Sequence, residues 1–304
     1  MPHANEQVLT PAQTRAGVSR ARLFFDLFKL RIGLVIGFTA MAGLAVTPGP
    51  SLPAWRIFAL ALGVTLASAA AGAFNQFAER DLDARMARTR GRPFVIGILH
   101  PGPAWLAAII AIGTAGVLLA ALAANAVAAL YVFLGAFTYG AVYTVWLKRR
   151  TCWNIVIGGL AGSFAVLAGA AAVNPTPGPL PLAFALILFL WTPPHFWSLA
   201  IAYREDYASA QVPMLPVLIG EVRAARTVLS ASIMLVTASL APAFLGMGWF
   251  YLLAALAGGA WLVLNSARLA LAPGRRAAMM NFHASLIQLT LLLCGAVVDA
   301  ALRA

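Results

Sequence analysis

Nine long apolar stretches constrain the fold of this chain more than any other feature. Each has about 20 residues, which is the length that one helix needs to cross a bilayer. Helices suit that environment because they pair their own backbone groups where lipid offers no partner. We therefore predict an all-α, polytopic membrane protein with nine transmembrane helices. The expected spans are residues 28–46, 55–78, 104–122, 125–146, 154–173, 180–200, 227–246, 249–268 and 280–300.

Composition excludes the main soluble classes. Of the 304 residues, 62% are apolar and 10% are charged, whereas an average soluble domain is about half apolar and about a quarter charged. A soluble globular fold, a disordered chain and a coiled coil are therefore ruled out. Residues 1–25 are expected to form a polar, disordered cytoplasmic tail, and residues 26–304 a single transmembrane domain.

The basic residues predict the orientation in the membrane. With the N-terminus inside, 19 of the 21 Lys and Arg residues fall in inside segments, and only Arg56 and Arg303 lie outside. This bias is typical of cytoplasmic loops. It places the long loops 79–103 and 201–226 in the cytoplasm, and it accounts for the net charge of +12 without a nucleic-acid partner. The two cysteines, Cys152 and Cys294, predict no disulfide framework.

Acidic residues are scarce but clustered, and the first cluster follows the second span. Asn75, Glu79 and Asp83 are spaced i, i+4 and i+8. On a continuing helix they would lie within about 80° of one another and span about 12 Å. Such a column of oxygen ligands suits one or two Mg²⁺ ions. Asp81 would point to the opposite side.

The second acidic cluster, Glu205 and Asp206, ends the sixth span. Mg²⁺ is usually bound by a few carboxylates together with substrate phosphates, and arginine pairs well with phosphate oxygens. Facing acidic clusters with a basic rim therefore predict a site for a metal and a diphosphate. The alternative interpretation is a solvated, salt-bridged cytoplasmic surface. The rim residues are Arg88, Arg92, Lys148 and Arg149.

At these residues the sequence resembles the UbiA superfamily of membrane prenyltransferases, and within it the heme-farnesylating branch. Asn75, Glu79 and Asp83 match the motif Asn-x3-Asp-x3-Asp, with Glu79 in the place of an Asp. The second motif is usually Asp-x3-Asp; here Asp206 matches its later position and Ala202 replaces the earlier one. Further similar segments are 29–31, 86–93, 143–159, 191–199, 205–207 and 212–216.

The resemblance implies nine helices around a central cavity and a reaction in which farnesyl diphosphate, heme B and water give heme O and diphosphate. It also implies Mg²⁺ as the cofactor and heme A synthase as a protein partner. We expect the chain in the lipid bilayer of a bacterial inner membrane; the alternative is an organellar inner membrane, because residues 7–22 are basic and contain no acidic residue. The implied catalytic and metal-binding residues are Asn75, Glu79, Asp83 and Asp206. The implied substrate-binding residues are Arg88, Arg92, Lys148, Arg149, Tyr143, His195 and Glu205.

Two questions stay open at this point. His195 follows Pro193 and Pro194 within an apolar span, so it is either a heme contact or a hydrogen-bonded packing residue. The chain as a whole could instead prenylate a quinone precursor or another aromatic acceptor, or it could be a transporter or a non-catalytic heme-handling protein. Carboxylates gathered at one membrane surface favour an enzyme.

Overall fold

The structure is a computed structural model that describes residues 19–303. Within this range all regular structure is helical, which confirms the predicted fold class. Eight helices are long and apolar enough to cross a membrane. Among the described residues the count rises to nine if a bent pair of consecutive helices is taken as one span: α2 (Arg20–Leu27) and α3 (Leu30–Ala45) meet at an angle of 54°. The nine predicted spans agree with this arrangement.

Five of the spans are single helices. They are α4 (Ala54–Ala78), α6 (Pro103–Ala123), α10 (Pro179–Ala202), α15 (Trp249–Leu271) and α16 (Arg275–Arg303). Three others consist of consecutive pieces. They are α7 (Ala126–Phe137) with the π-helix η1 (Thr138–Leu147), α8 (Asn154–Gly158) with α9 (Leu160–Val173), and α13 (Glu221–Ala238) with α14 (Ala241–Phe244).

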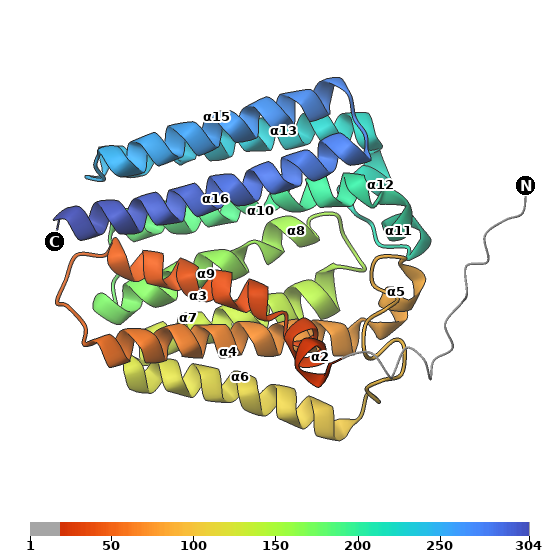
Figure 1. Cartoon of the computed structure of the whole chain (residues 1–304), viewed down its shortest axis with the longest axis horizontal. Coiled ribbons are helices and arrows are strands. Elements are labelled where there is room, and N and C mark those ends of the chain that lie inside the picture. Colours follow the sequence, from red (N-terminus) through yellow and green to blue (C-terminus); the bar gives the residue numbers. More distant parts are fainter. Residues whose placement is uncertain (1–18, 304) are drawn as a thin grey trace, which may run out of the picture.

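Short helices gather at one end of the bundle. They are α5 (Arg80–Arg85), α11 (Arg204–Ser209) and α12 (Leu215–Ile219), and with their connecting loops we call them the loop end (right in Figure 1). The C-terminal end of α16 lies at the opposite end (Figure 1). Both long acidic loops of the sequence are therefore on the same side of the bundle.

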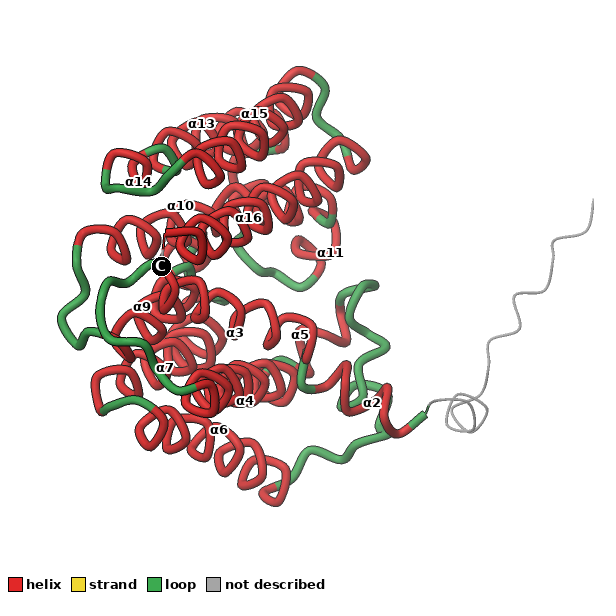
Figure 2. The backbone as a smooth tube through the Cα atoms, turned by 60° about the vertical axis from the view of Figure 1, so that its left-hand side comes forward, coloured by secondary structure: helices red, strands yellow, loops and turns green. Residues whose placement is uncertain are grey.

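The spans pack in two groups, each around its own apolar core. In one group, α3, α4, α6, α7 and α9 enclose mainly alanines together with Leu60, Val64 and Val132. In the other, α10, α13, α15 and α16 enclose larger side chains such as Phe184, Tyr251 and Leu292. Figure 2 shows the two groups in separate regions of the molecule, and α3 and α9 are the members of the first group that contact the second. A third core lies under the loop end and includes Trp197.

The prediction of a disordered tail over residues 1–25 is wrong for residues 20–25, the helical part of it that the structure describes. Residues 1–18 of the tail lie outside the described residues, but α2 begins at Arg20, so residues 20–25 are helical rather than disordered. The helix is amphipathic, and its apolar side chains Leu23 and Leu27 are buried. Gln76 Nε2 donates to the carbonyls of Asp26 and Leu27. These bonds add donors to carbonyls of the last helical turn, where the helix itself supplies few.

Candidate active site

The column of Asn75, Glu79 and Asp83 persists across a break between two helices. α4 ends at Ala78 and α5 begins at Arg80. Even so, the Glu79 N–H donates to the Asn75 carbonyl at 3.0 Å, and the Asp83 N–H donates to the Glu79 carbonyl at 2.8 Å. The helical repeat is therefore kept, and the three side chains are all buried. The predicted i, i+4, i+8 column is present in the structure.

Each member of the column contacts a basic residue from another part of the chain. Lys148 Nζ lies 2.5 Å from Glu79 Oε2, and Arg92 Nη1 lies 2.6 Å from Asp83 Oδ2. Lys29 Nζ donates to Asn75 Oδ1 at 2.8 Å. Three cations thus meet two carboxylates and one amide, which leaves surplus positive charge at a buried site. Such a site attracts an anion.

Lys29 is one of the basic residues around the column, and the sequence analysis did not predict it there. It lies at the bend between α2 and α3 and has φ of 47°, a backbone conformation that is uncommon for residues other than glycine. Its ammonium also donates to the Tyr139 hydroxyl at 2.9 Å. In the sequence Lys29 was only part of a motif at the start of the first span. Its contact with Asn75, 46 residues away, has no local signal.

The π-helix η1 supplies an aromatic wall beside the cations. Tyr139 and Tyr143 stack with ring centroids 5.7 Å apart. Lys29 Nζ lies 5.6 Å from the Tyr139 ring, and Lys148 Nζ lies 5.8 Å from the Tyr143 ring. Thr144 Oγ1 accepts from Asn75 Nδ2 at 3.2 Å. π-Helical turns are frequent at functional sites, and here the turn brings three polar side chains to the column.

Asp81 and Arg149 form a separate pair on the surface. Two hydrogen bonds of 2.7 and 2.8 Å join them, and each side chain is nearly half exposed. The bonds from Arg149 lower the pKa of the Asp81 carboxyl. Asp81 thus points away from the column, in agreement with the helical spacing. Arg149 was predicted to bind the diphosphate at the rim of the site, but in the structure its guanidinium is paired with Asp81.

One loop joins the first acidic cluster to the second. Thr89 Oγ1 donates to the Asp83 carbonyl at 3.1 Å, and the Arg88 N–H donates to Asp206 Oδ2 at 3.1 Å. Ser209 Oγ on α11 also donates to the Arg85 carbonyl at 3.2 Å. These bonds hold α11 against the loop that follows α5. Asp206 is therefore at the same end of the bundle as the column.

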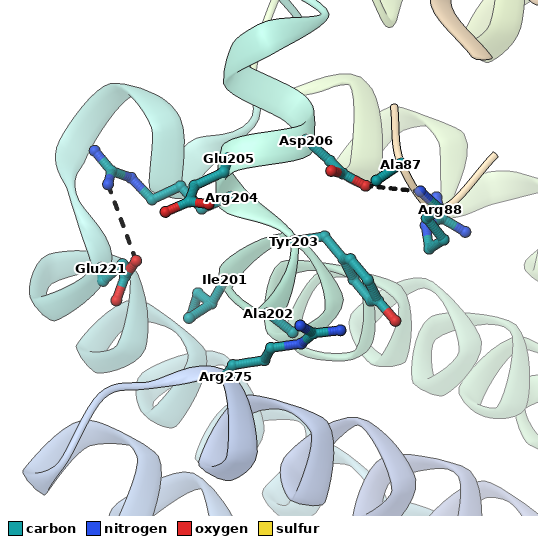
Figure 3. Close-up of a pocket in the computed structure, with 10 residues that line it drawn as sticks. All are labelled: Ala87, Arg88, Ile201, Ala202, Tyr203, Arg204, Glu205, Asp206, Glu221 and Arg275. Carbon is teal, nitrogen blue, oxygen red and sulfur yellow. Dashed lines mark hydrogen bonds and ion pairs between the residues drawn. The ribbon is translucent and has the colours of Figure 1, made fainter. Parts of the chain in front are cut away.

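A pocket of about 460 Å³ opens beside Asp206 (Figure 3). Arg88, predicted to bind substrate, lines this pocket, and its guanidinium lies beside the Tyr203 ring (Figure 3). Glu205 is exposed at its edge. The lining residues are Ala87, Arg88, Ile201, Ala202, Tyr203, Arg204, Glu205, Asp206, Glu221 and Arg275.

His195 lies deeper in the bundle, on α10, about 10 Å along the helix from its last residue. Its ring is sandwiched between Trp191 and Phe282, with centroid distances of 4.1 and 4.3 Å. Its Nδ1 is 2.7 Å from Ser285 Oγ. The ring orientation is therefore held on both faces and at one nitrogen, while α10 continues unbroken through Pro193 and Pro194.

The column fits Mg²⁺ by its donor chemistry. Among residues 19–303, no three His, Cys, Asp or Glu side chains come together as a metal cluster. Mg²⁺ requires fewer, because one or two carboxylates suffice when substrate phosphates complete its coordination. Glu79 and Asp83 supply two carboxylates, and Asn75 supplies an amide oxygen. In addition, Glu79 Oε1 is buried without a hydrogen-bond partner.

Comparison with known proteins gives one consistent family. Residues 36–287 match the model of the UbiA prenyltransferase family. A protein named protoheme IX farnesyltransferase 2, from Paramagnetospirillum magneticum, is 56% identical over 91% of this chain and 96% of its own. A protoheme IX farnesyltransferase from Alkalilimnicola ehrlichii is 40% identical over 97% of both chains.

Solved structures match the fold at low sequence identity. One is described as a study of digeranylgeranylglyceryl phosphate synthase, with a TM-score of 0.74, 16% identity and coverage of 92% of this chain and 98% of that one. Another is a UbiA homolog from Archaeoglobus fulgidus bound to GPP and Mg²⁺, with a TM-score of 0.70, 16% identity and coverage of 92% and 99%.

Proposed function

The chain belongs to the UbiA prenyltransferase family, and from that membership we propose that it makes heme O. In the reaction the farnesyl group of farnesyl diphosphate is transferred to a vinyl group of heme B, water is added, and diphosphate leaves. The names of the curated relatives support heme as the acceptor. One structural observation carries the proposal: a buried column of oxygen ligands is surrounded by three cations from separate elements.

The cations of the column bind the diphosphate. Lys148 is paired with Glu79, and Arg92 is paired with Asp83. The diphosphate oxygens compete for the same ammonium and guanidinium groups, and Lys29 adds a third donor. Asn75, Glu79, Asp83 and Asp206 would hold Mg²⁺, and the ion would supply positive charge to the diphosphate as it leaves.

The apolar walls of the site protect the allylic cation that diphosphate departure creates. Tyr139 and Tyr143 present their ring faces beside the column, and a ring face stabilises positive charge. Burial of the column keeps bulk water away until the vinyl group has attacked. His195 then belongs to the acceptor side of the site, with its ring held by Trp191, Phe282 and Ser285.

The same proposal includes a location. The loop end faces the cytoplasm of a bacterium, because 19 of 21 basic residues lie in segments assigned to that side. The chain resides in the inner membrane, where apolar farnesyl chains and heme can enter from the bilayer. Heme A synthase is the protein partner that we propose to receive the product.

A reconstitution experiment tests the function. Purified protein in liposomes is given farnesyl diphosphate, heme B and Mg²⁺, and the extracted hemes are analysed by mass spectrometry. We expect heme O, and we expect chelation of Mg²⁺ to abolish it. A parallel reaction replaces heme with 4-hydroxybenzoate as an aromatic acceptor. Prenylation of this acid without heme O would overturn the assignment, as would a folded preparation that forms no prenylated product.

A further inference from the structure

The pocket beside Asp206 contains an arrangement that the diphosphate chemistry does not use. Arg88 and Arg275 both lie against the ring of Tyr203, with Cζ atoms 5.4 and 5.3 Å from its centroid. Figure 3 shows the two guanidinium groups reaching the ring from different elements, one from the loop after α5 and one from the start of α16. Both positive charges therefore lie beside one aromatic side chain.

Neither guanidinium has an acidic partner. Among the described residues, no ion pair within 4 Å includes Arg88 or Arg275. The acidic side chains of the pocket do not compensate them: Asp206 accepts the backbone N–H of Arg88, and Glu221 lies 3.9 Å from Arg204. Two guanidinium groups beside one ring and without ion pairs can each bind one negative group. A ligand with two separate negative groups therefore fits them.

We propose that Arg88 and Arg275 bind the two propionate carboxylates of the porphyrin acceptor, with Tyr203 holding the guanidiniums in position. The inference rests on the proposed function and deepens it, because it assigns the site of the second substrate. A guanidinium and a carboxylate form two parallel hydrogen bonds, so two arginines match two carboxylates. The start of α16 adds the partial positive charge of a helix N-terminus.

Charge distinguishes this pocket from the diphosphate site. The column has three cations against two carboxylates, and that surplus suits a diphosphate. The pocket has Arg88, Arg204 and Arg275 against Glu205, Asp206 and Glu221, so its charges balance. A compact polyanion would face these three carboxylates, whereas two separate monoanionic groups can each be bound by one arginine. The pocket therefore selects a dicarboxylate over a second diphosphate.

The position of the pocket suits the transfer of the farnesyl group. The propionates and the vinyl groups of heme B are on opposite edges of the porphyrin. With its propionates at the loop end, the macrocycle rests on apolar side chains of α10 and directs a vinyl edge into the bundle. Ile201 and Ala202 line the pocket there, and Trp197 is buried one turn away. The loop that carries Arg88 contacts Asp206 at the pocket and Asp83 of the column, so the two sites are neighbours on this loop.

Binding of heme in the absence of farnesyl diphosphate tests this site. The purified full chain in detergent is titrated with heme B, and with its dimethyl ester, in which both propionates are neutral; absorbance reports binding. We expect the ester to bind the wild type about tenfold more weakly than the free acid, which corresponds to about 1.4 kcal/mol. Arg275→Gln should bind the free acid about tenfold more weakly than the wild type does, and its affinity for the ester should be unchanged. Arg276→Gln, its exposed neighbour, is the matched control and should bind both as the wild type does.

Steady-state kinetics complete the test. For Arg275→Gln we expect a higher KM for heme and an unchanged KM for farnesyl diphosphate. Equal affinity of the wild type for acid and ester overturns the propionate site, and a rise in the KM for farnesyl diphosphate assigns the pocket to diphosphate instead. Heme O formation by the wild type reports separately on the proposed function. If heme O forms but Arg275→Gln binds heme B as tightly as the wild type does, only this inference fails. If the wild type neither binds heme B nor forms heme O, both proposals fail.

Discussion

Glu79 and Asp83 carry negative charge where almost no solvent reaches them, with 1% and 2% of their surfaces exposed. A buried ion pair is weak evidence for stability, because desolvation opposes the Coulomb attraction. Buried ionisable groups in a membrane protein are more often kept for function. The unpaired Oε1 of Glu79 supports that view, since a purely structural carboxylate would have both oxygens bonded.

Removal of one charge from the column should stop the reaction while the fold remains. Asp83→Asn keeps the shape of the side chain and its place in the helix, but it weakens the metal ligand and the bond to Arg92. We expect kcat/KM for heme O formation to fall by at least about 100-fold, as for the loss of an electrostatic stabiliser at a reacting group. The thermal midpoint in detergent checks that the fold is kept. Asp26→Asn, an exposed carboxylate, is the control, and comparable activity of both variants contradicts the role of Asp83.

A different result is expected for Lys29, which donates to Asn75 and Tyr139 and has no ion pair with an acidic side chain among residues 19–303. Lys29→Met removes the ammonium but keeps an unbranched stem to pack against Gly72. Because a charge-assisted bond to the diphosphate acts before and during the reaction, we expect the KM for farnesyl diphosphate to rise about tenfold, with a smaller effect on kcat. Initial rates over a range of farnesyl diphosphate concentrations measure this. A fall in kcat at unchanged KM would assign Lys29 to the chemical step.

At the scale of elements, the site depends on helices that cross very closely. A Cβ added to Gly169 of α9 would lie 1.7 Å from the Ala40 carbonyl oxygen of α3, and one added to Gly43 of α3 would lie 2.2 Å from the Val166 carbonyl oxygen of α9. Backbone contact of this kind is typical of membrane helices joined through small residues. Through it α3 is held against α9 and α4, and the start of α3 carries Lys29 to the column.

Gly169→Ala should therefore force α3 and α9 apart. We expect a loss of about 3 kcal/mol or more of stability, at the upper end for overpacking, because backbone cannot move aside as a side chain can. Activity should fall with it, since Lys29 shifts with α3. Thermal unfolding in detergent measures the effect. Gly162→Ala on the same helix is the control, because its Cβ would meet only ordinary contacts of 3.7 Å with Leu188; equal destabilisation by both changes contradicts the crossing argument.

At the scale of the whole molecule, charge is distributed along the bundle axis. The acidic clusters, their cations and the pocket of Tyr203 are all at the loop end, while the opposite end has short connections with Arg56 and Arg303 as its basic residues. One end thus handles charged groups, and the apolar remainder faces lipid or accommodates an isoprenoid chain. This polarity underlies the proposed cytoplasmic orientation of the loop end.

Cysteine labelling can measure that orientation. In a Cys152→Ser and Cys294→Ser background, Gly91→Cys reports on the loop end and Ser51→Cys on the opposite end; both positions are exposed. With a membrane-impermeant thiol reagent on intact, outer-membrane-permeabilised cells, we expect label at position 51 only. Inverted inner-membrane vesicles should give label at position 91 only. The reverse pattern would refute a cytoplasmic active site.

The column could be predicted from the sequence because its three residues are close together in the chain. The spacing of Asn75, Glu79 and Asp83 lies within two helical turns, and it persisted because i to i−4 bonds continue across the break at Glu79. Asp81 was likewise placed on the other side by helical spacing alone. Part of the fold was predictable for the same reason, since the length of an apolar run decides whether a helix can cross a bilayer.

The sequence by itself determined the class of fold, the spans, the asymmetry of charge and the column, all of which depend on residues near one another in the chain. Only the tertiary structure decided that Lys148 lies against Glu79, 69 residues away, that Lys29 joins Asn75, and that Arg88 and Arg275 share Tyr203. These contacts depend on how separate helices are rotated and how closely they cross. That arrangement is set by lateral packing of small residues, and the spacing of such residues does not say which other helix they will contact.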